Sequence, residues 1–299
     1  MVPNDTYLEG FAEHLKGRGM SLATIESYCR DARDFMAFIA GYRLPAHLVE
    51  AETLKAFQDH LTHHQTDKIN SVRRKVIGVR QFFRFLTHSR RLADTPFDDV
   101  PLPDRSELMP RENILDRVDI LIRQVEGQED SLKGTRDRAI VLLLATEGLK
   151  ANELIQLEWR DLYLGQDLVT LSVRGARGRV LTVGTPAAMA VRAYWGRYAA
   201  VGQTRKKEGA TEKMFVAFQG RDGETPLPQI TRHGLKFLIY ELGEHAGIPH
   251  CNTELLRHFA ISHQLEQGRD PEEIMHRLGL RRLGLIAKHA GKKRTQVAP

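Results

Sequence analysis

The sequence predicts a mainly helical protein with one small β-hairpin, divided into two domains. Three observations lead to this fold class. Apolar residues recur at spacings of three and four over much of the chain, which is the period of a helix that buries one face. One stretch, residues 169–183, alternates instead between apolar and polar residues. Four prolines fall within residues 94–111, which have no hydrophobic period, so we expect a linker there.

Composition limits the classes of protein that this chain can belong to. Its 299 residues, 41% hydrophobic and 27% charged, suit a soluble protein with two cores. The longest purely apolar run, residues 139–145, is too short to span a bilayer, and no secretion signal precedes it. Cys29 and Cys251 fit a reducing cytoplasm. The formal net charge of +6 favours a polyanionic partner. No cofactor and no small-molecule substrate are expected.

Residues 1–93 are predicted to form an all-helical domain. One helix begins after Ser21, a plausible N-cap, and carries apolar residues from Leu22 to Ile39. A second begins at Ile69 and carries a buried stripe as far as Leu86.

The second of these helices gives the first indication of function. Its arginines, spaced by seven, four and seven residues, fall within about 20° of one line along the helix axis. Such a row suits the regular phosphates of a nucleic acid, although an ordinary solvated face is the alternative. The row consists of Arg73, Arg80, Arg84 and Arg91.

Residues 112–299 are predicted to form a mixed domain. Helices are expected near residues 135–146, 151–159, 187–198, 229–246 and 252–267, with the hairpin before the third. The clearest helix start is Asp270 as N-cap, with Pro271 in the first turn and Glu273 placed for a capping box. Gly279 ends that helix. The residues after His289 are expected to form a short, basic, flexible tail.

Several of these segments resemble the tyrosine recombinase, or phage integrase, family, in its Xer-like form. The resemblance extends over nearly the whole chain and implies that residues 1–93 are a core-binding, SAM-like DNA-binding domain. Residues 112–299 would then be the catalytic-type domain, and the two would close around duplex DNA as a C-shaped clamp. The segments that carry the resemblance are SLATIESYCRDARDFMAFI, RRKVIGVRQFFRFLTHSRRLADTP, RDRAIVLLLATEGLKANELIQLEWRDL, VTLSVRGARGRVLTV and TELLRHFAISHQLEQGRDPEEIMHRLG.

The family resemblance implies that active members cleave DNA by attack of a tyrosine, without a metal. This sequence lacks most of the residues that such cleavage requires. Active members use two arginines on the phosphate, a lysine as general acid, two histidine-type residues and the nucleophilic tyrosine. Lysine in place of the first arginine loses the two-pronged donor, and a glutamate beside phosphate repels it. One of the six positions is kept, as Arg257. In chain order the six fall on Lys150, Ala176, Glu254, Arg257, Leu280 and His289.

The leading hypothesis is therefore a catalytically inactive relative that binds double-stranded DNA, as an architectural, nucleoid-associated or regulatory factor in the cytoplasm. An active recombinase or nicking enzyme is the alternative, with His289 or a partner's tyrosine as nucleophile. A third hypothesis is a regulator that binds itself or another recombinase. DNA contacts are expected at Arg73, Arg80, Arg84, Lys150, Arg177, Arg179, Arg257, Arg281, Arg282 and Lys288.

No metal site is expected. Three histidines, His60, His63 and His64, have the spacing of a helical metal pair, but no cysteine or carboxylate set accompanies them. A polar helix end explains them better.

Overall fold

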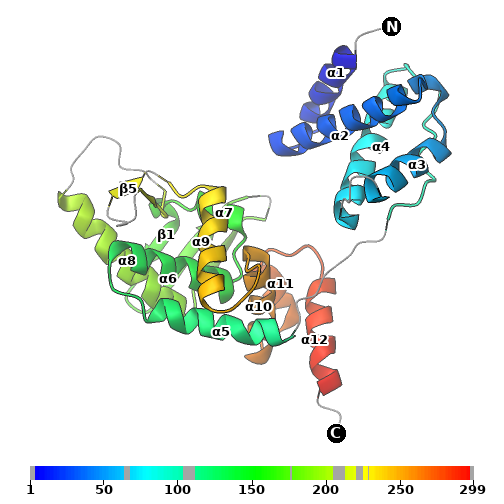
Figure 1. Cartoon of the computed structure of the whole chain (residues 1–299). Coiled ribbons are helices and arrows are strands. Elements are labelled where there is room, and N and C mark those ends of the chain that lie inside the picture. The colour runs from blue at the N-terminus through cyan, green and yellow to red at the C-terminus, as the bar shows by residue number, and fades with distance from the viewer. Residues whose placement is uncertain are drawn as a thin grey trace. The chain divides into compact units, whose positions relative to one another are not determined.

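The chain forms two compact units, residues 1–108 and residues 109–299, in a computed structural model (Figure 1). The structure describes residues 4–63, 68–103, 112–175, 177–204, 213–219, 225–227 and 229–296. Within these ranges the fold is mainly helical, with one three-stranded antiparallel sheet and one two-stranded pair. The predicted fold class is confirmed in these terms. None of the described helices is long and apolar enough to span a bilayer.

The described residues of the first unit form four α-helices, which are α1 (Asn4–Gly17), α2 (Leu22–Gly41), α3 (Ala51–His63) and α4 (Ile69–His88). The predicted N-cap of α2 is confirmed, because the Ser21 hydroxyl accepts a hydrogen bond from the Thr24 backbone N–H at 3.3 Å. Phe35 lies at the centre of the core, where its ring meets those of Phe57 and Phe83 edge to face.

Residues 94–103, the described part of the expected linker, pack on the core of the first unit. Phe97 is fully buried, with its ring 4.5 Å from that of Phe83, and Val100 is buried beside it. The prolines stiffen this segment, and its apolar side chains Phe97, Val100 and Leu102 hold it against the core of the first unit. The remainder of the expected linker, residues 104–111, lies outside the described residues.

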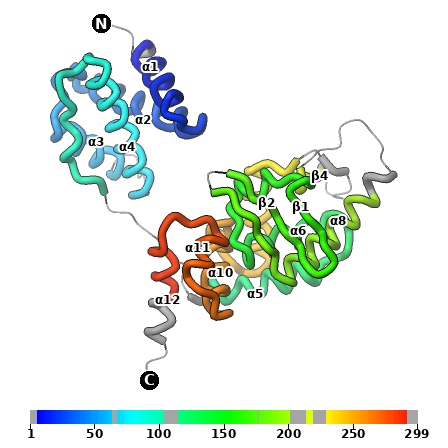
Figure 2. The backbone as a smooth tube through the Cα atoms, turned by 180° about the vertical axis from the view of Figure 1, so that it is seen from behind, coloured from blue at the N-terminus to red at the C-terminus, as the bar shows by residue number. Residues whose placement is uncertain are grey.

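The second unit is built around α6 (Leu132–Ala145), whose residues 139–145 are all buried. Helices α5 (Glu112–Glu126) and α8 (Thr185–Thr204) pack against it (Figure 2). The short α7 (Ala151–Gln156) follows α6, and α9 (Arg232–His245) packs against α5 and α7.

The predicted hairpin is confirmed as β2 (Val169–Val173) and β3 (Arg179–Thr182). A further strand, β1 (Leu162–Leu164), adds to β2, so the antiparallel order is β1-β2-β3. Leu171 faces Leu181 in the register and both are buried, which fixes the inner side of the sheet. Strands β4 (Ala217–Gln219) and β5 (Thr225–Leu227) form the separate pair.

The last three helices lie side by side at the C-terminal end of the chain (Figures 1 and 2). They are α10 (Thr253–Glu266), α11 (Pro271–Arg277) and α12 (Gly284–Gln296). The predicted start of α11 is confirmed, because the Asp270 carboxylate accepts the backbone N–H groups of Glu272 and Glu273. The expectation of a flexible tail after His289 is wrong as far as Gln296, since those residues continue α12. Its anchor is Ile286, buried in one cluster with Ile261, Ile274 and Leu278.

Candidate functional site

A basic pocket of about 420 Å³ lies where α7 begins, beside the β2–β3 hairpin and the turn after α11. Three segments far apart in the sequence meet there, and each contributes at least one cation. The described residues that line it are Lys150, Asn152, Glu153, Gln156, Arg174, Gly175, Arg177, Gly279 and Arg281.

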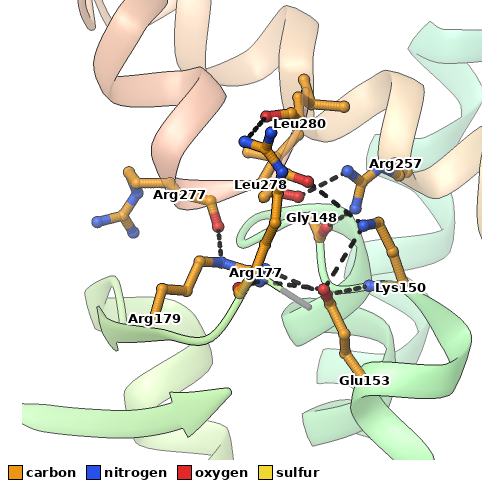
Figure 3. A network of polar contacts seen from close by, with 10 residues as sticks. Gly148, Lys150, Glu153, Arg177, Arg179, Arg257, Arg277, Leu278 and Leu280 are labelled. Carbon is orange, nitrogen blue, oxygen red and sulfur yellow. Dashed lines mark hydrogen bonds and ion pairs between the residues drawn. The ribbon is translucent and has the colours of Figure 1, made fainter. Parts of the chain in front are cut away.

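Glu153 joins the hairpin to α7. Its carboxylate accepts the backbone N–H of Lys150 at 2.9 Å, which closes the first turn of the helix. The same carboxylate accepts two hydrogen bonds from the Arg179 guanidinium, at 3.0 and 3.1 Å (Figure 3). Burial acts to raise the pKa of Glu153, but the Arg179 and Lys150 hydrogen bonds outweigh it and hold the pKa below its ordinary value.

Arg257 is enclosed behind the pocket. Its guanidinium donates to the Gly148 carbonyl at 2.7 Å and to the Leu278 carbonyl at 2.6 Å, and the residue is 3% exposed (Figure 3). Arg257 therefore connects α10, through hydrogen bonds, to the turn before α7 and to the end of α11. Gly148 has φ of +67°, and a Cβ there would lie 2.6 Å from Leu278 Cγ, so this approach requires glycine. Arg257 was expected to contact DNA, but in this structure its donors are turned to main-chain carbonyls.

The exposed cations of the pocket surround the turn at Gly279 and Leu280. Arg177 donates to the Leu280 carbonyl at 2.8 Å (Figure 3). Lys150 Nζ donates to the Gly279 carbonyl at 3.3 Å. Arg281 lines the same pocket with an exposed side chain, and Arg282 is exposed next to it in the chain. Donors from two elements thus converge on one turn.

Lys150 has an unusual electrostatic environment for a lysine. Its side chain is 47% exposed and its ammonium lies 3.8 Å from the Glu153 carboxylate. Burial lowers the pKa of Lys150, and Arg257, Arg179 and Arg177 lower it further against the opposing effect of Glu153.

Sequence reasoning missed three residues of this pocket. Arg174 lies on the same hairpin, where it forms ion pairs with Glu158 and Asp161. Asn152 and Gln156 lie four residues apart on α7, a spacing that places them on one face of the helix. That spacing could have indicated from the sequence that the two side chains lie on the same surface as Lys150. Ala176, the expected lysine position on the hairpin, lies outside the described residues.

His289 lies inside the second unit and is not among the residues that line the pocket. It is 5% exposed, its Nε2 is 2.9 Å from His258 Nδ1, and its Nδ1 is 2.7 Å from Ser262 Oγ. Both ring nitrogens are therefore engaged by α10, on which α12 packs. The sequence did not indicate these partners.

Three further residues that were expected at the catalytic or DNA-contact positions, Glu254, Leu280 and Lys288, differ in their exposure. Glu254 is exposed in the first turn of α10, and Leu280 is half-buried and packs against the cluster that anchors α12. Lys288 is exposed on α12. The pocket contains none of them.

Two arginines of α4, Arg73 and Arg84, contact residues 94–103 of their own unit, and Arg91 lies beyond the end of α4 at His88. Arg73 donates to the Pro103 carbonyl, and Arg84 pairs with Asp98 at 2.9 Å. Arg80 is half-buried, and burial lowers its pKa. The Arg91 guanidinium lies over the Tyr7 ring, 4.5 Å from its centroid. Residues 98 and 103 thus supply acceptors to Arg84 and Arg73, and the four arginines expected on one helix are divided, because Arg91 lies outside α4.

No group of three or more metal-ligating side chains occurs among the residues that the structure describes. His60 and His63 lie in the last turn of α3, and the third histidine of that spacing, His64, is outside the described ranges.

Comparison with known proteins identifies the family. Residues 116–289 match the Phage integrase family, and residues 8–90 match the N-terminal SAM-like domain of phage integrases. Tyrosine recombinase XerC of Xanthomonas campestris pv. campestris is 29% identical over 276 residues, 91% of this chain and 80% of the relative. Tyrosine recombinase XerD of Rhizobium meliloti is 27% identical over 279 residues, 91% of this chain and 86% of the relative.

A solved structure shows the same fold. The XerH site-specific recombinase, bound to its difH substrate before cleavage, superposes with a TM-score of 0.68 at 15% identity, covering 99% of this chain and 85% of the other. Since the family match includes more than half of the residues, this chain belongs to the phage integrase family.

Proposed function

We propose that this chain binds double-stranded DNA through the basic pocket and does not cut it. The observation that carries the proposal is His289, which occupies the position expected for the nucleophilic tyrosine. It is buried, and both of its ring nitrogens are held by His258 and Ser262. A nucleophile needs a free lone pair directed at phosphorus, and this imidazole offers none to solvent.

The other expected catalytic positions support the same reading. Lys150 keeps the positive charge but not the planar fork that holds two phosphate oxygens. Glu254 supplies a carboxylate where a donor is required. Each such loss lowers a rate by about two or more orders of magnitude, so the combined effect removes cleavage.

Binding, in contrast, needs only exposed donors and positive charge. Arg177, Arg281 and Lys150 are exposed at the pocket. Relatives of this chain are named as tyrosine recombinases, and the structurally similar XerH recombinase was solved bound to its difH substrate. We propose that both units contribute to duplex binding, and that the protein acts at the nucleoid as an architectural or regulatory factor. Association with a second copy or with an active recombinase belongs to this proposal.

Fluorescence anisotropy with a labelled duplex tests the binding. The double variant Arg177→Ala, Arg281→Ala should bind at least several-fold more weakly than wild type, because two phosphate donors are removed. Arg197→Ala changes an exposed arginine on α8 outside the pocket, so it is the matched control and should bind like wild type. Equal affinity for the double variant and the control would overturn the assigned site.

A nicked suicide duplex tests the absence of cleavage. An active recombinase becomes trapped on such a substrate as a covalent adduct, visible as a slower band on a denaturing gel. We expect no adduct at protein concentrations that saturate binding. An adduct that persists in His289→Ala would show that another group attacks, and one that depends on His289 would identify this residue as the nucleophile; either adduct would contradict the proposal.

A further inference from the structure

The pocket places a partly exposed lysine amine among guanidinium groups. Among the described residues that line it, Lys150 is the one lysine, and Arg174, Arg177 and Arg281 line the same space. Guanidinium groups bind phosphate, and a lysine amine reacts with aldehydes to form imines. Side by side, these groups match a ligand that carries an aldehyde close to a phosphate.

The surroundings of Lys150 favour its reactive form. The nearest carboxylate, Glu153, has both oxygens hydrogen-bonded by the Arg179 fork and lies 3.8 Å from Nζ. Burial and the cations Arg257, Arg179 and Arg177 lower the pKa of Lys150. A lower pKa increases the fraction of neutral amine, which is the nucleophile in imine formation.

DNA that has lost a base presents this combination of groups. The deoxyribose of an abasic nucleotide opens to an aldehyde at C1′ and keeps a phosphate on either side. We propose that Lys150 forms an imine with the aldehyde of an abasic nucleotide whose flanking phosphates are held by the arginines of the pocket.

The chemistry balances without a further reactant. The Nζ lone pair attacks C1′ and a C–N bond forms. The two protons of the neutral amine leave with the carbonyl oxygen as one molecule of water, and a C=N bond remains. No group is oxidised or reduced in this step. The inference rests on the proposed DNA binding, because phosphate contacts must bring the aldehyde to the amine.

Reductive trapping tests the proposal. The full-length protein is incubated at saturating concentration with a duplex containing one abasic site, in the presence of cyanoborohydride, which reduces the imine to a stable amine. We expect a covalent adduct on a denaturing gel and its attachment to Lys150 by peptide mass spectrometry.

Two variants test whether the adduct forms at Lys150 and not at another lysine. Lys150→Arg keeps the charge but has no reactive amine, so the adduct, normalised to the bound fraction, should fall at least tenfold. Lys236→Arg changes an exposed lysine of α9 outside the pocket and should leave the yield unchanged. An adduct of equal yield in Lys150→Arg, or one that maps to other lysines, would overturn the proposal.

A second arm identifies the source of the aldehyde, because a free phosphorylated aldehyde carries the same groups. Pyridoxal phosphate with the same reductant provides this arm. Modification of Lys150 by pyridoxal phosphate but not by abasic DNA would overturn the assignment to DNA. Binding of an undamaged duplex is measured in parallel. If the undamaged duplex binds and no adduct forms, this inference fails alone, whereas loss of that binding refutes the proposed function.

Discussion

Asp31 is a carboxylate buried between two helices of the first unit. Its side chain is 1% exposed, one oxygen accepts a hydrogen bond from Arg74, and the other has no hydrogen-bond partner among the described residues. Burial raises the pKa of Asp31, although Arg74 acts in the opposite direction. The ionised form is therefore disfavoured by folding.

This environment predicts a pH dependence of stability. Because the folded state binds the Asp31 proton more tightly than the unfolded state, its contribution to the unfolding free energy is greatest at low pH and is lost as pH rises through the carboxyl range. The stability of wild type relative to Asp31→Asn should therefore fall as pH rises above about 4, the ordinary pKa of an aspartate. Calorimetry of the full chain at several pH values measures this difference in unfolding free energy. Asp59→Asn, which changes an exposed carboxylate on α3, is the matched control. A relative stability that rises over this range would contradict the prediction.

At the pocket, individual residues differed in how far the sequence could place them. Lys150 and Arg177 were expected near a phosphate site, and the structure brings both to one turn. Arg257 was expected there too, but its burial depends on carbonyl groups of residues 148 and 278, which no local pattern indicates. The family resemblance implied which cations belong to this region, while their exposure depends on the tertiary fold.

Among the elements, those with local signals were predicted best. The N-caps Ser21 and Asp270 are each bonded to amides two or three residues away, so the sequence is sufficient to find them. The packing of residues 94–103 and the seating of α12 depend on partners distant in the chain. His289 meets side chains 27 and 31 residues before it, and no periodicity reports that contact.

The contact between α2 and α4 depends on Gly78. A Cβ at this position would lie 2.7 Å from Asp31 Oδ2 and 2.8 Å from Asp31 Cβ. Gly78→Ala should therefore lower the unfolding free energy of the first unit by about 1–3 kcal/mol, the usual cost of overpacking. This occurs although alanine favours a helix by about 1 kcal/mol. Calorimetry measures the change. Gly17→Ala places its Cβ in open space on α1, and it should leave the transition unchanged or slightly raised.

The seating of α12 on α10 gives a second prediction for an element. His289→Ala removes the partner of His258 Nδ1 and of Ser262 Oγ, and an unmade buried hydrogen bond costs about 1–3 kcal/mol. The backbone amides of residues 284–296 should then exchange with deuterium at least tenfold faster, while α6 keeps its protection. Arg282→Ala, an exposed change just before α12, is the control. Unchanged exchange in His289→Ala would show that the apolar contacts of Ile286 hold the helix without the histidine.

For the whole molecule, the net charge of +6 does not identify where a polyanion binds, because charge is distributed between two units that each neutralise part of it. In the first unit, Arg73 and Arg84 of the α4 row are bound to residues 94–103. In the second, Glu153 neutralises Arg179, and Arg177 and Arg281 remain exposed at the pocket. Exposed charge that is not already paired determines how many counterions a bound DNA releases.

The salt dependence of binding therefore measures whether Arg177 and Arg281 contact phosphate. The logarithm of the association constant falls with the logarithm of salt concentration, with a slope of about 0.9 per phosphate contact. Removing two contacts in Arg177→Ala, Arg281→Ala should reduce the magnitude of the slope by about 2, and Arg197→Ala should leave it unchanged. Anisotropy titrations from about 50 to about 200 mM salt measure both slopes. If the double variant weakens binding at every salt concentration but keeps the wild-type slope, these arginines act on the fold of the pocket and do not contact phosphate.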